Sequence, residues 1–242
     1  MPKSFKQTSD IKIALGWARD RLGELNGAAI FLSETNAERF IEAFITDDSF
    51  SFTMDSGFIY GHAYGPNPHI DQRWEKCAVA FSEFGPKFGH LERANQFDTY
   101  GITTKTIPGF EDIEVLTDEE LIKNILDEHA PTSSTYPGNP EIIHWGCVRN
   151  EAGEVSALGA LVKWSSGSYV ISSVATVESQ RGKGFATSLV KRFISKANQL
   201  GIQTISLGVS HENIPAIKAY QRAGMSEIAQ FTNYLKPGFQ RN

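Results

Sequence analysis

A short glycine-rich run stands between a predicted strand and a predicted helix in the second half of the chain. Residues 170–177 are rich in β-branched side chains, which favour a strand, and residues 187–200 repeat apolar side chains at helical spacing. Between them lies the run 181–186, which reads RGKGFA. A turn that leads into a helix directs free backbone N–H groups and the positive end of the helix dipole at one point, and such a point binds phosphate. The two glycines would let a phosphate approach the backbone, and the arginine and lysine add positive charge.

Two better-known phosphate-binding loops do not fit this run. A P-loop separates its glycines by four residues and continues with Gly-Lys-Ser/Thr, whereas here one residue separates Gly182 from Gly184. The dinucleotide-binding fingerprint Gly-x-Gly-x-x-Gly would need a third glycine at the position of Thr187. The pattern that fits is Arg-x-x-Gly-x-Ala, which begins at Arg181.

A second constellation follows further along the chain. A predicted strand over 204–209 precedes Asn213, a favourable helix cap, and a predicted helix over 214–223 that has a proline in its first turn and a glycine after its end. Asn213 and Tyr220 are seven residues apart, so they share one face of this helix. The order Val-x-x-x-Asn-x-x-Ala-x-x-x-Tyr-x-x-x-Gly-Met begins at Val209.

Together the two signatures resemble those of the GCN5-related N-acetyltransferase (GNAT) superfamily, over roughly residues 112–235. The resemblance implies an α/β fold with a mixed central sheet flanked by helices, and acetyl-CoA as cosubstrate. It also implies that the loop binds the CoA pyrophosphate and that the backbone of the preceding strand pairs with the pantetheine arm as an added strand would. The cofactor-binding residues that it indicates are Val174, Ala175, Thr176, Val177, Arg181, Gly182, Lys183, Gly184, Phe185, Ala186, Thr187, Asn213 and Tyr220.

Some of these residues also have a purely structural explanation. Capping alone would account for Asn213, and Arg181 would also be unremarkable as a solvated charge beside a loop. The side chain of Lys183 could point into solvent while only its backbone N–H contacts phosphate.

Acyl transfer from a thioester to an amine sets the chemical requirements. The carbonyl must be polarised, the amine must lose a proton, and the departing thiolate must be stabilised or protonated. The resemblance places Tyr220 beside the CoA sulfur, so we expect it to act as general acid. Because a phenol has a pKa of about 10 and a thiol about 8.5, this role needs a lowered tyrosine pKa or a concerted transfer. A tyrosine packed on the sheet is the structural alternative.

The expected general base is Glu178, which lies just past the central strand, where many GNAT relatives have proline. A solvated turn carboxylate is the alternative. His211 and Glu212 at the end of the next strand, and His144 on an earlier strand, are further candidates, and His144 also fits a buried core histidine. Each could act through one water molecule.

The second half is predicted to run strand, helix, three strands, helix, strand, helix, strand. A capping box, with Thr117 as cap and Glu120 reaching back, begins a helix that ends near His129. Residues 131–140 are rich in Ser, Thr, Pro and Gly and are expected to form a loop. The resemblance implies that this loop is a mobile flap that faces the acceptor. The other strands are expected at 113–116, 142–148, 156–164 and 170–177, with one or two final strands within 228–235.

The first half carries no motif of known function. Its predicted order of helix, strand, helix, strand, strand resembles a degenerate copy of the same acetyltransferase domain, although it has no Arg-x-x-Gly-x-Gly or Arg-x-x-Gly-x-Ala loop. A linker near 105–110 divides the chain into an N-terminal α/β domain, 1–105, and a catalytic domain, 106–242. The expected elements are a helix over 11–25 capped by Asp10, a strand over 28–32, a helix around 40–45, strands over 49–53 and 57–64 joined by a turn at 55–57, and a helix over 74–84.

Composition limits the class of protein. The chain has 242 residues, 40% of them hydrophobic, and a net charge of −5, which argues against a dedicated nucleic-acid partner. Cys77 and Cys147 are far apart and lack metal-ligand spacing, so we expect two buried thiols and no metal site. No apolar run is long enough for a membrane span, and the first residues lack the apolar core of a signal peptide. These features predict a cytoplasmic protein, monomeric or homodimeric, without a membrane partner.

The sequence therefore predicts an N-acetyltransferase that moves an acetyl group from acetyl-CoA to a primary amine of a small molecule or peptide. The site should lie where the central strand and the strand over 204–209 move apart. The alternative is a CoA-binding sensor or interaction module without turnover. Tyr220 argues against that alternative, and the lack of an obvious base argues for it. A nucleotide-binding module would instead be stabilised by ATP and not by acetyl-CoA.

Overall fold

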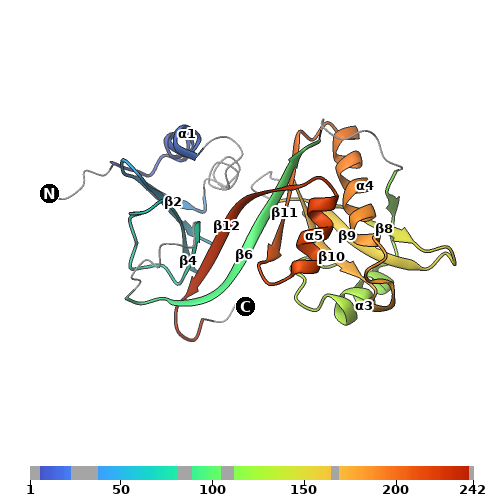
Figure 1. The fold of residues 1–242 in the computed structure, drawn as a ribbon. Coiled ribbons are helices and arrows are strands. Elements are labelled where there is room, and N and C mark those ends of the chain that lie inside the picture. Colours follow the sequence, from blue (N-terminus) through green and yellow to red (C-terminus); the bar gives the residue numbers. More distant parts are fainter. Residues whose placement is uncertain (1–5, 23–37, 81–88, 105–111, 165–168, 240–242) are drawn as a thin grey trace.

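The computed structural model describes residues 6–22, 38–80, 89–104, 112–164 and 169–239, and it has the predicted α/β fold (Figure 1). Its helices pack on a mixed sheet that runs through the whole molecule. In chain order the elements are β1 (Lys6–Thr8), α1 (Ile11–Leu22), β2 (Phe40–Ile45), β3 (Phe50–Asp55), β4 (Ile59–Tyr64), β5 (Lys76–Ala80), β6 (Glu92–Thr103), β7 (Glu114–Val115), α3 (Glu119–His129), β8 (Ile142–Arg149), β9 (Val155–Lys163), β10 (Tyr169–Thr176), the 3₁₀ turn η2 (Glu178–Gln180), α4 (Phe185–Gln199), β11 (Thr204–Ser210), α5 (Ile214–Arg222) and β12 (Ser226–Leu235).

The sheet order shows how the two halves are joined. Across the described residues twelve strands follow the order β1-β2-β3-β4-β5-β12-β6-β11-β10-β9-β8-β7. The pairs β4–β5 and β10–β11 are parallel, and the other neighbours are antiparallel. The predicted order of elements in the second half is confirmed, with β12 as a single final strand.

Two long strands cross between the halves. β6 comes from the first half but lies beside β11, which it pairs from Thr204↔Thr103 to Ser210↔Phe97. β12 comes from the second half and pairs with β5 on its other side. Figure 1 shows β6 and β12 side by side, running from one half of the molecule to the other. The two halves therefore share a hydrogen-bonded ladder. The boundary at 105/106 lies outside the described residues, and the division into 1–105 and 106–242 stays a prediction.

Two predicted helices in the first half are strands. Residues 40–45 form β2, which pairs with β1 and β3, and the segment expected to be helical from 74 contains β5. Residues 40–45 read FIEAFI and are apolar at every position but Glu42, and a short apolar run cannot be assigned to helix or strand by periodicity alone. The order of elements that suggested a degenerate copy was therefore wrong, and β6 had no counterpart in the prediction. The strand expected over 28–32 and the end of the first helix lie outside the described residues.

Local caps and turns follow the sequence with one correction. Asp10 begins α1 as expected, because its Oδ1 accepts from the backbone N of Lys12 at 2.8 Å. Asp55 accepts from the backbone N of Gly57 at 2.9 Å in the predicted turn. α3, however, is capped by Asp118, not by Thr117: the Asp118 carboxylate accepts from the backbone N of Leu121 at 2.9 Å. The predicted capping box is thus wrong, because the cap lies one residue further on.

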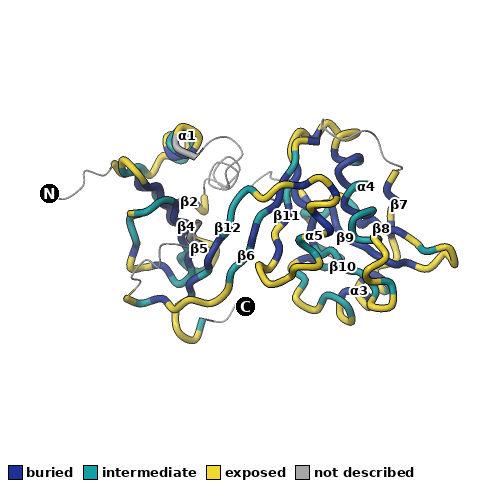
Figure 2. The backbone as a smooth tube through the Cα atoms, in the orientation of Figure 1, coloured by how far each residue is buried: buried dark blue, intermediate teal, exposed yellow. Residues whose placement is uncertain are grey.

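The second half has a separate hydrophobic core on each face of the sheet. Along β9, Ala157 and Leu161 pack in the cluster that contains α4 and α5 residues, whereas Leu158 and Ala160 pack in the cluster that contains α3 residues. Figure 2 shows these strands buried between the exposed surfaces of the helices. Cys77 and Cys147 are buried and free, as predicted. None of the described helices is long and apolar enough to cross a bilayer.

Candidate functional site

The sheet opens between its two central parallel strands. β10 and β11 share a single register pair, Val170↔Ser206, and separate beyond it. Each strand keeps its other neighbour: β10 stays paired with β9 as far as Thr176↔Ala157, and β11 stays paired with β6 as far as Ser210. This is the separation of strands that the sequence predicted. It leaves one backbone edge of β10 without a strand partner.

A β-bulge decides which side chains of β10 face the opening. The register against β9 shifts between Ser172 and Ala175, and Ser173 has φ of 52°. The extra residue reverses the alternation of side chains, so Val174 packs on the α4 and α5 side and Ala175 on the α3 side. The bulge is held from the loop after α3, because the Ser173 hydroxyl donates to the carbonyl of Thr135 at 2.8 Å and accepts from its N–H at 3.1 Å.

A cavity of about 450 Å³ lies against β10, the glycine-rich loop and α5. Ten of the predicted site residues line it: Val174, Thr176, Arg181, Gly182, Gly184, Phe185, Ala186, Thr187, Asn213 and Tyr220. Seven further residues line it that the sequence did not indicate: His129, Gln180, Pro215, Ala216, Lys218, Ala219 and Arg222.

Four predicted site residues do not line the cavity. Ala175 and Val177 pack in the cluster on the α3 side of the sheet, as the alternation after the bulge requires. Lys183 is exposed, and its Nζ donates to Oε1 of Gln180 at 3.0 Å. Glu178 is exposed on the 3₁₀ turn that follows β10.

The loop presents a row of unused backbone donors. Its main-chain hydrogen bonds stop where Arg181 N donates to Glu178 O at 3.1 Å and resume where Ser188 N donates to Gly184 O at 3.0 Å. Among the described residues, no atom accepts from the amides of 182–187. Gly182 and Gly184 have φ of 79° and 88°, a conformation that other residues rarely adopt, and a Cβ on either would meet no protein atom within 4 Å. The glycines are thus required by backbone conformation, and the space beside them is open.

The N-terminus of α4 is directed at the cavity. The helix runs from Phe185, and it is fixed on the sheet by the buried side chains of Leu189, Val190 and Phe193. Thr187 in its first turn donates from Oγ1 to the carbonyl of Ala219 at 3.2 Å, which ties α4 to α5. The free amides and the positive end of the helix dipole therefore act together at the cavity.

Arg181 joins three elements at the cavity wall. Its Nε donates to the carbonyl of Thr176 at the end of β10 at 3.3 Å, and its terminal nitrogen donates to the carbonyl of His129 at the end of α3 at 3.2 Å. These contacts hold the guanidinium beside the loop amides. They also explain why His129 reaches the cavity although it is far from the loop in sequence.

α5 brings a cap and a buried phenol to the cavity. Asn213 accepts on Oδ1 from the backbone N of Ala216 at 3.2 Å, so it caps α5 as predicted while it lines the cavity. Tyr220 is 6% exposed, and burial raises its pKa to about 12. The phenol is therefore neutral at neutral pH and is a hydrogen-bond donor. It does not have the lowered pKa that would make a stepwise proton transfer easy.

The other histidine candidates lie apart from the cavity. His144 stacks on Phe193 with ring centroids 6.0 Å apart, and burial lowers its pKa, so it is the core histidine that the sequence also allowed. His211 contacts both carboxylate oxygens of Asp98 through Nδ1, at 3.0 and 3.1 Å. Asp98 lies on β6, so the first half supplies the partner of this histidine.

The cavity carries positive charge and suits an anion. Arg181, Lys218 and Arg222 line it, and none of its described lining residues is Asp or Glu. In the part of the chain that the structure describes, no three His, Cys, Asp or Glu side chains gather as a metal site would need. Free amides, three cations and an open strand edge fit a ligand with phosphate groups and an extended, amide-containing arm.

Comparison with known proteins places this site in a family. Residues 111–225 match the acetyltransferase (GNAT) family. A curated relative, the uncharacterized N-acetyltransferase YvbK of Bacillus subtilis (strain 168), is 29% identical over 102 residues, which cover 42% of this chain and 59% of that protein. The chain thus spans less than two thirds of that relative's length.

Solved structures extend the likeness of fold to both halves. A GCN5-related N-acetyltransferase from Sphaerobacter thermophilus has a TM-score of 0.59 at 15% identity, and the alignment covers 100% of this chain and 99% of that one. A Drosophila protein has a TM-score of 0.60 at 9% identity, with coverage of 98% and 100%. At such identities the likeness concerns the fold alone.

The family match spans the glycine-rich loop, the two separating strands and the helix that carries Tyr220. The residues that carried the resemblance are also those that line the cavity. Residues 111–225 of this chain therefore belong to the acetyltransferase (GNAT) family.

Proposed function

We propose that the chain is an N-acyltransferase that moves an acetyl group from acetyl-CoA to a primary amine. The observation that carries the proposal is the cavity beside β10, which is lined both by the glycine-rich loop with its free amides and by Tyr220. Acetyl-CoA would supply an activated thioester, and direct attack by the amine would need no covalent bond to the protein.

The loop and β10 would bind the cosubstrate. The amides of 182–187 and the guanidinium of Arg181 would bind the pyrophosphate, because donors and positive charge converge there. The edge of β10 that faces away from β9, at Val174 and Thr176, would pair with the pantetheine amides. The backbone N of Val177 donates to the carbonyl of Ser156 at 3.0 Å, so Val177, and Ala175 two residues before it, direct their backbone groups toward β9 and away from this edge.

Tyr220 would stabilise the departing sulfur by donating a hydrogen bond. Its pKa of about 12 exceeds that of a free thiol, about 8.5, by about 3.5 pH units, or about 5 kcal/mol. Full proton transfer to a completed thiolate would be uphill by that amount. The tyrosine would therefore act while the carbon–sulfur bond breaks, in a concerted step.

Two side chains are candidates for the proton acceptor. Glu178 is the candidate from sequence, and from its exposed turn it would act through a water molecule. His129 lines the cavity from the end of α3, and among the described lining residues it is the only imidazole. The lining favours His129, because the other ionisable side chains there are cations and a phenol of high pKa.

The test combines binding with thiol release. Acetyl-CoA should raise the melting temperature of the protein, and free CoA should appear when a panel of small primary amines and N-terminal peptides is added. Binding without thiol release from any amine would favour a CoA-binding sensor. Stabilisation by ATP and not by acetyl-CoA would contradict both. The cytoplasmic location and the monomeric or homodimeric state stay predictions from the sequence.

A further inference from the structure

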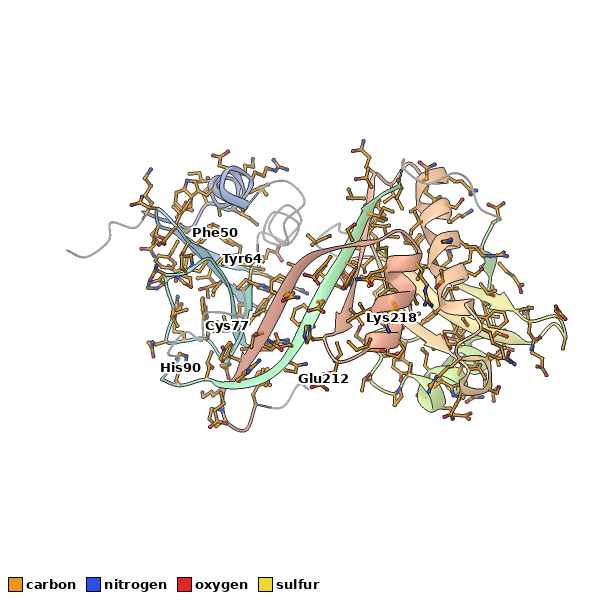
Figure 3. All side chains as sticks on the ribbon, viewed as in Figure 1. Phe50, Tyr64, Cys77, His90, Glu212 and Lys218 are labelled. Atoms are coloured by element: carbon orange, nitrogen blue, oxygen red, sulfur yellow. The ribbon has the colours of Figure 1, made fainter. Side chains whose placement is uncertain are left out.

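Two cations on α5 have no role in the proposed function so far. Lys218 and Arg222 both line the cavity, and both are exposed. They are four residues apart on one helix, so their side chains project from the same face. Figure 3 shows Lys218 on α5. Within the described residues neither forms an ion pair, so their charges are available to a ligand.

In the proposed function the glycine-rich loop binds the pyrophosphate. Its free amides and Arg181 lie on one wall of the cavity, and a pyrophosphate there would meet several donors. The cations of α5 line the same cavity, and none of its described lining residues is acidic. A ligand that carries a second, separate phosphate group would use both the loop amides and these cations. Coenzyme A is such a ligand, because it carries a 3′-phosphate on its ribose in addition to its pyrophosphate.

We propose that Lys218 and Arg222 bind the 3′-phosphate of CoA and make the protein select CoA thioesters over their 3′-dephospho forms. The assignment rests on the proposed function, since it concerns the same cosubstrate. Both side chains are solvent-exposed, so their attraction for phosphate is moderate and weakens with added salt. We expect a preference of about tenfold for CoA at low salt.

The experiment measures dissociation constants of CoA and 3′-dephospho-CoA by isothermal titration calorimetry. The variants are the wild type, K218A/R222A, and the matched control K12A/R19A, which removes the same two residue types from exposed positions on α1. The wild type and the control should prefer CoA about tenfold. K218A/R222A should bind CoA as weakly as dephospho-CoA and should bind dephospho-CoA as the wild type does.

Other outcomes overturn the assignment in distinct ways. Equal affinity of the wild type for the two ligands would show that no residue recognises the 3′-phosphate. A preference for CoA that survives in K218A/R222A would show that other residues bind the 3′-phosphate. A failure of the wild type to bind either ligand would overturn the proposed function, and this assignment with it. Because both replaced side chains are exposed, the melting temperature of the double variant should match that of the wild type, which excludes unfolding as the cause of lost binding.

Discussion

The two parallel strand pairs of this protein differ in whether they stay closed. In the first half, β4 and β5 remain paired over four residues, from Tyr60↔Lys76 to Ala63↔Val79. In the second half, β10 and β11 pair only at Val170↔Ser206. The connection between β4 and β5, residues 65–75, contains no helix, whereas α4 connects β10 to β11. The first pair therefore has neither an open strand edge nor the N-terminus of a connecting helix beside it, and the second pair has both.

Two buried tyrosines show the same difference at the level of side chains. Tyr64 is fully buried among Phe50, Phe52 and His62, and burial raises its pKa, as it raises that of Tyr220. Only Tyr220 also lines the cavity beside the free amides. A shifted pKa therefore does not by itself mark a functional tyrosine, because access to a ligand is also required.

The largest effect is expected from filling the space beside the glycine-rich loop. Gly184→Val should weaken acetyl-CoA binding about 100-fold or more, because valine strains the positive φ and fills open space beside the amides. Titration calorimetry would measure it. Gly57→Val is the matched control, since Gly57 also has a positive φ with no atom near an added Cβ but lies in the first half. Equal affinity of the two variants would contradict the role of the loop.

The two tyrosines can be compared directly. Tyr220→Phe should lower kcat about 100-fold and leave the dissociation constant of acetyl-CoA almost unchanged, because it removes one donor at the sulfur. Tyr64→Phe should leave kcat unchanged. Steady-state kinetics with a fixed amine would measure both. A parallel loss of kcat and binding in Tyr220→Phe would argue for a packing role instead.

The buried imidazole of His62 in the first half should make the stability of the protein depend on pH. Burial lowers the pKa of His62 to about 3, below the value of about 6.5 in an unfolded chain. Between about pH 6.5 and about pH 3 this histidine is therefore protonated in the unfolded state and neutral in the folded state. Its neutral form costs no stability above about pH 6.5, and the free energy of unfolding falls as the pH drops toward 3. At pH 5 the loss from this residue is about 2 kcal/mol.

Replacing the histidine tests this dependence. His62→Phe should lose less unfolding free energy between pH 7 and pH 5 than the wild type, as measured by urea denaturation, because phenylalanine does not titrate. Phenylalanine can also stack on Phe52 as the imidazole does, with ring centroids 4.9 Å apart. Identical pH profiles for the variant and the wild type would assign the dependence to other groups.

The smallest effect separates the two candidate bases. His129→Asn should lower kcat about tenfold and Glu178→Gln less than about threefold, because only His129 lines the cavity. Both variants should keep their affinity for acetyl-CoA. The reverse ranking in a comparison of kcat would restore Glu178 as the base.

The sequence predicted correctly those turns and helix caps that depend on neighbouring residues. The glycines of the loop, Asn213 as a cap and the start of α1 were predictable, because turn conformation and capping depend on a few neighbouring residues. Prediction failed at β2 and β5, because a short apolar run buried on both faces has no period that distinguishes strand from helix. The bulge at Ser173, which turns Val174 toward the cavity and Ala175 away, left no trace in the alternation of residue types.

The sequence by itself determined the glycine-rich turn before α4, the tyrosine that follows it and the family to which both point, because their geometry is set within one or two turns of chain. Tertiary structure alone decided that β6 crosses from the first half to flank β11, and that His129, Lys218 and Arg222 reach the same cavity. Those contacts join segments that are distant in sequence, and they depend on how strands pair and helices pack in the complete sheet.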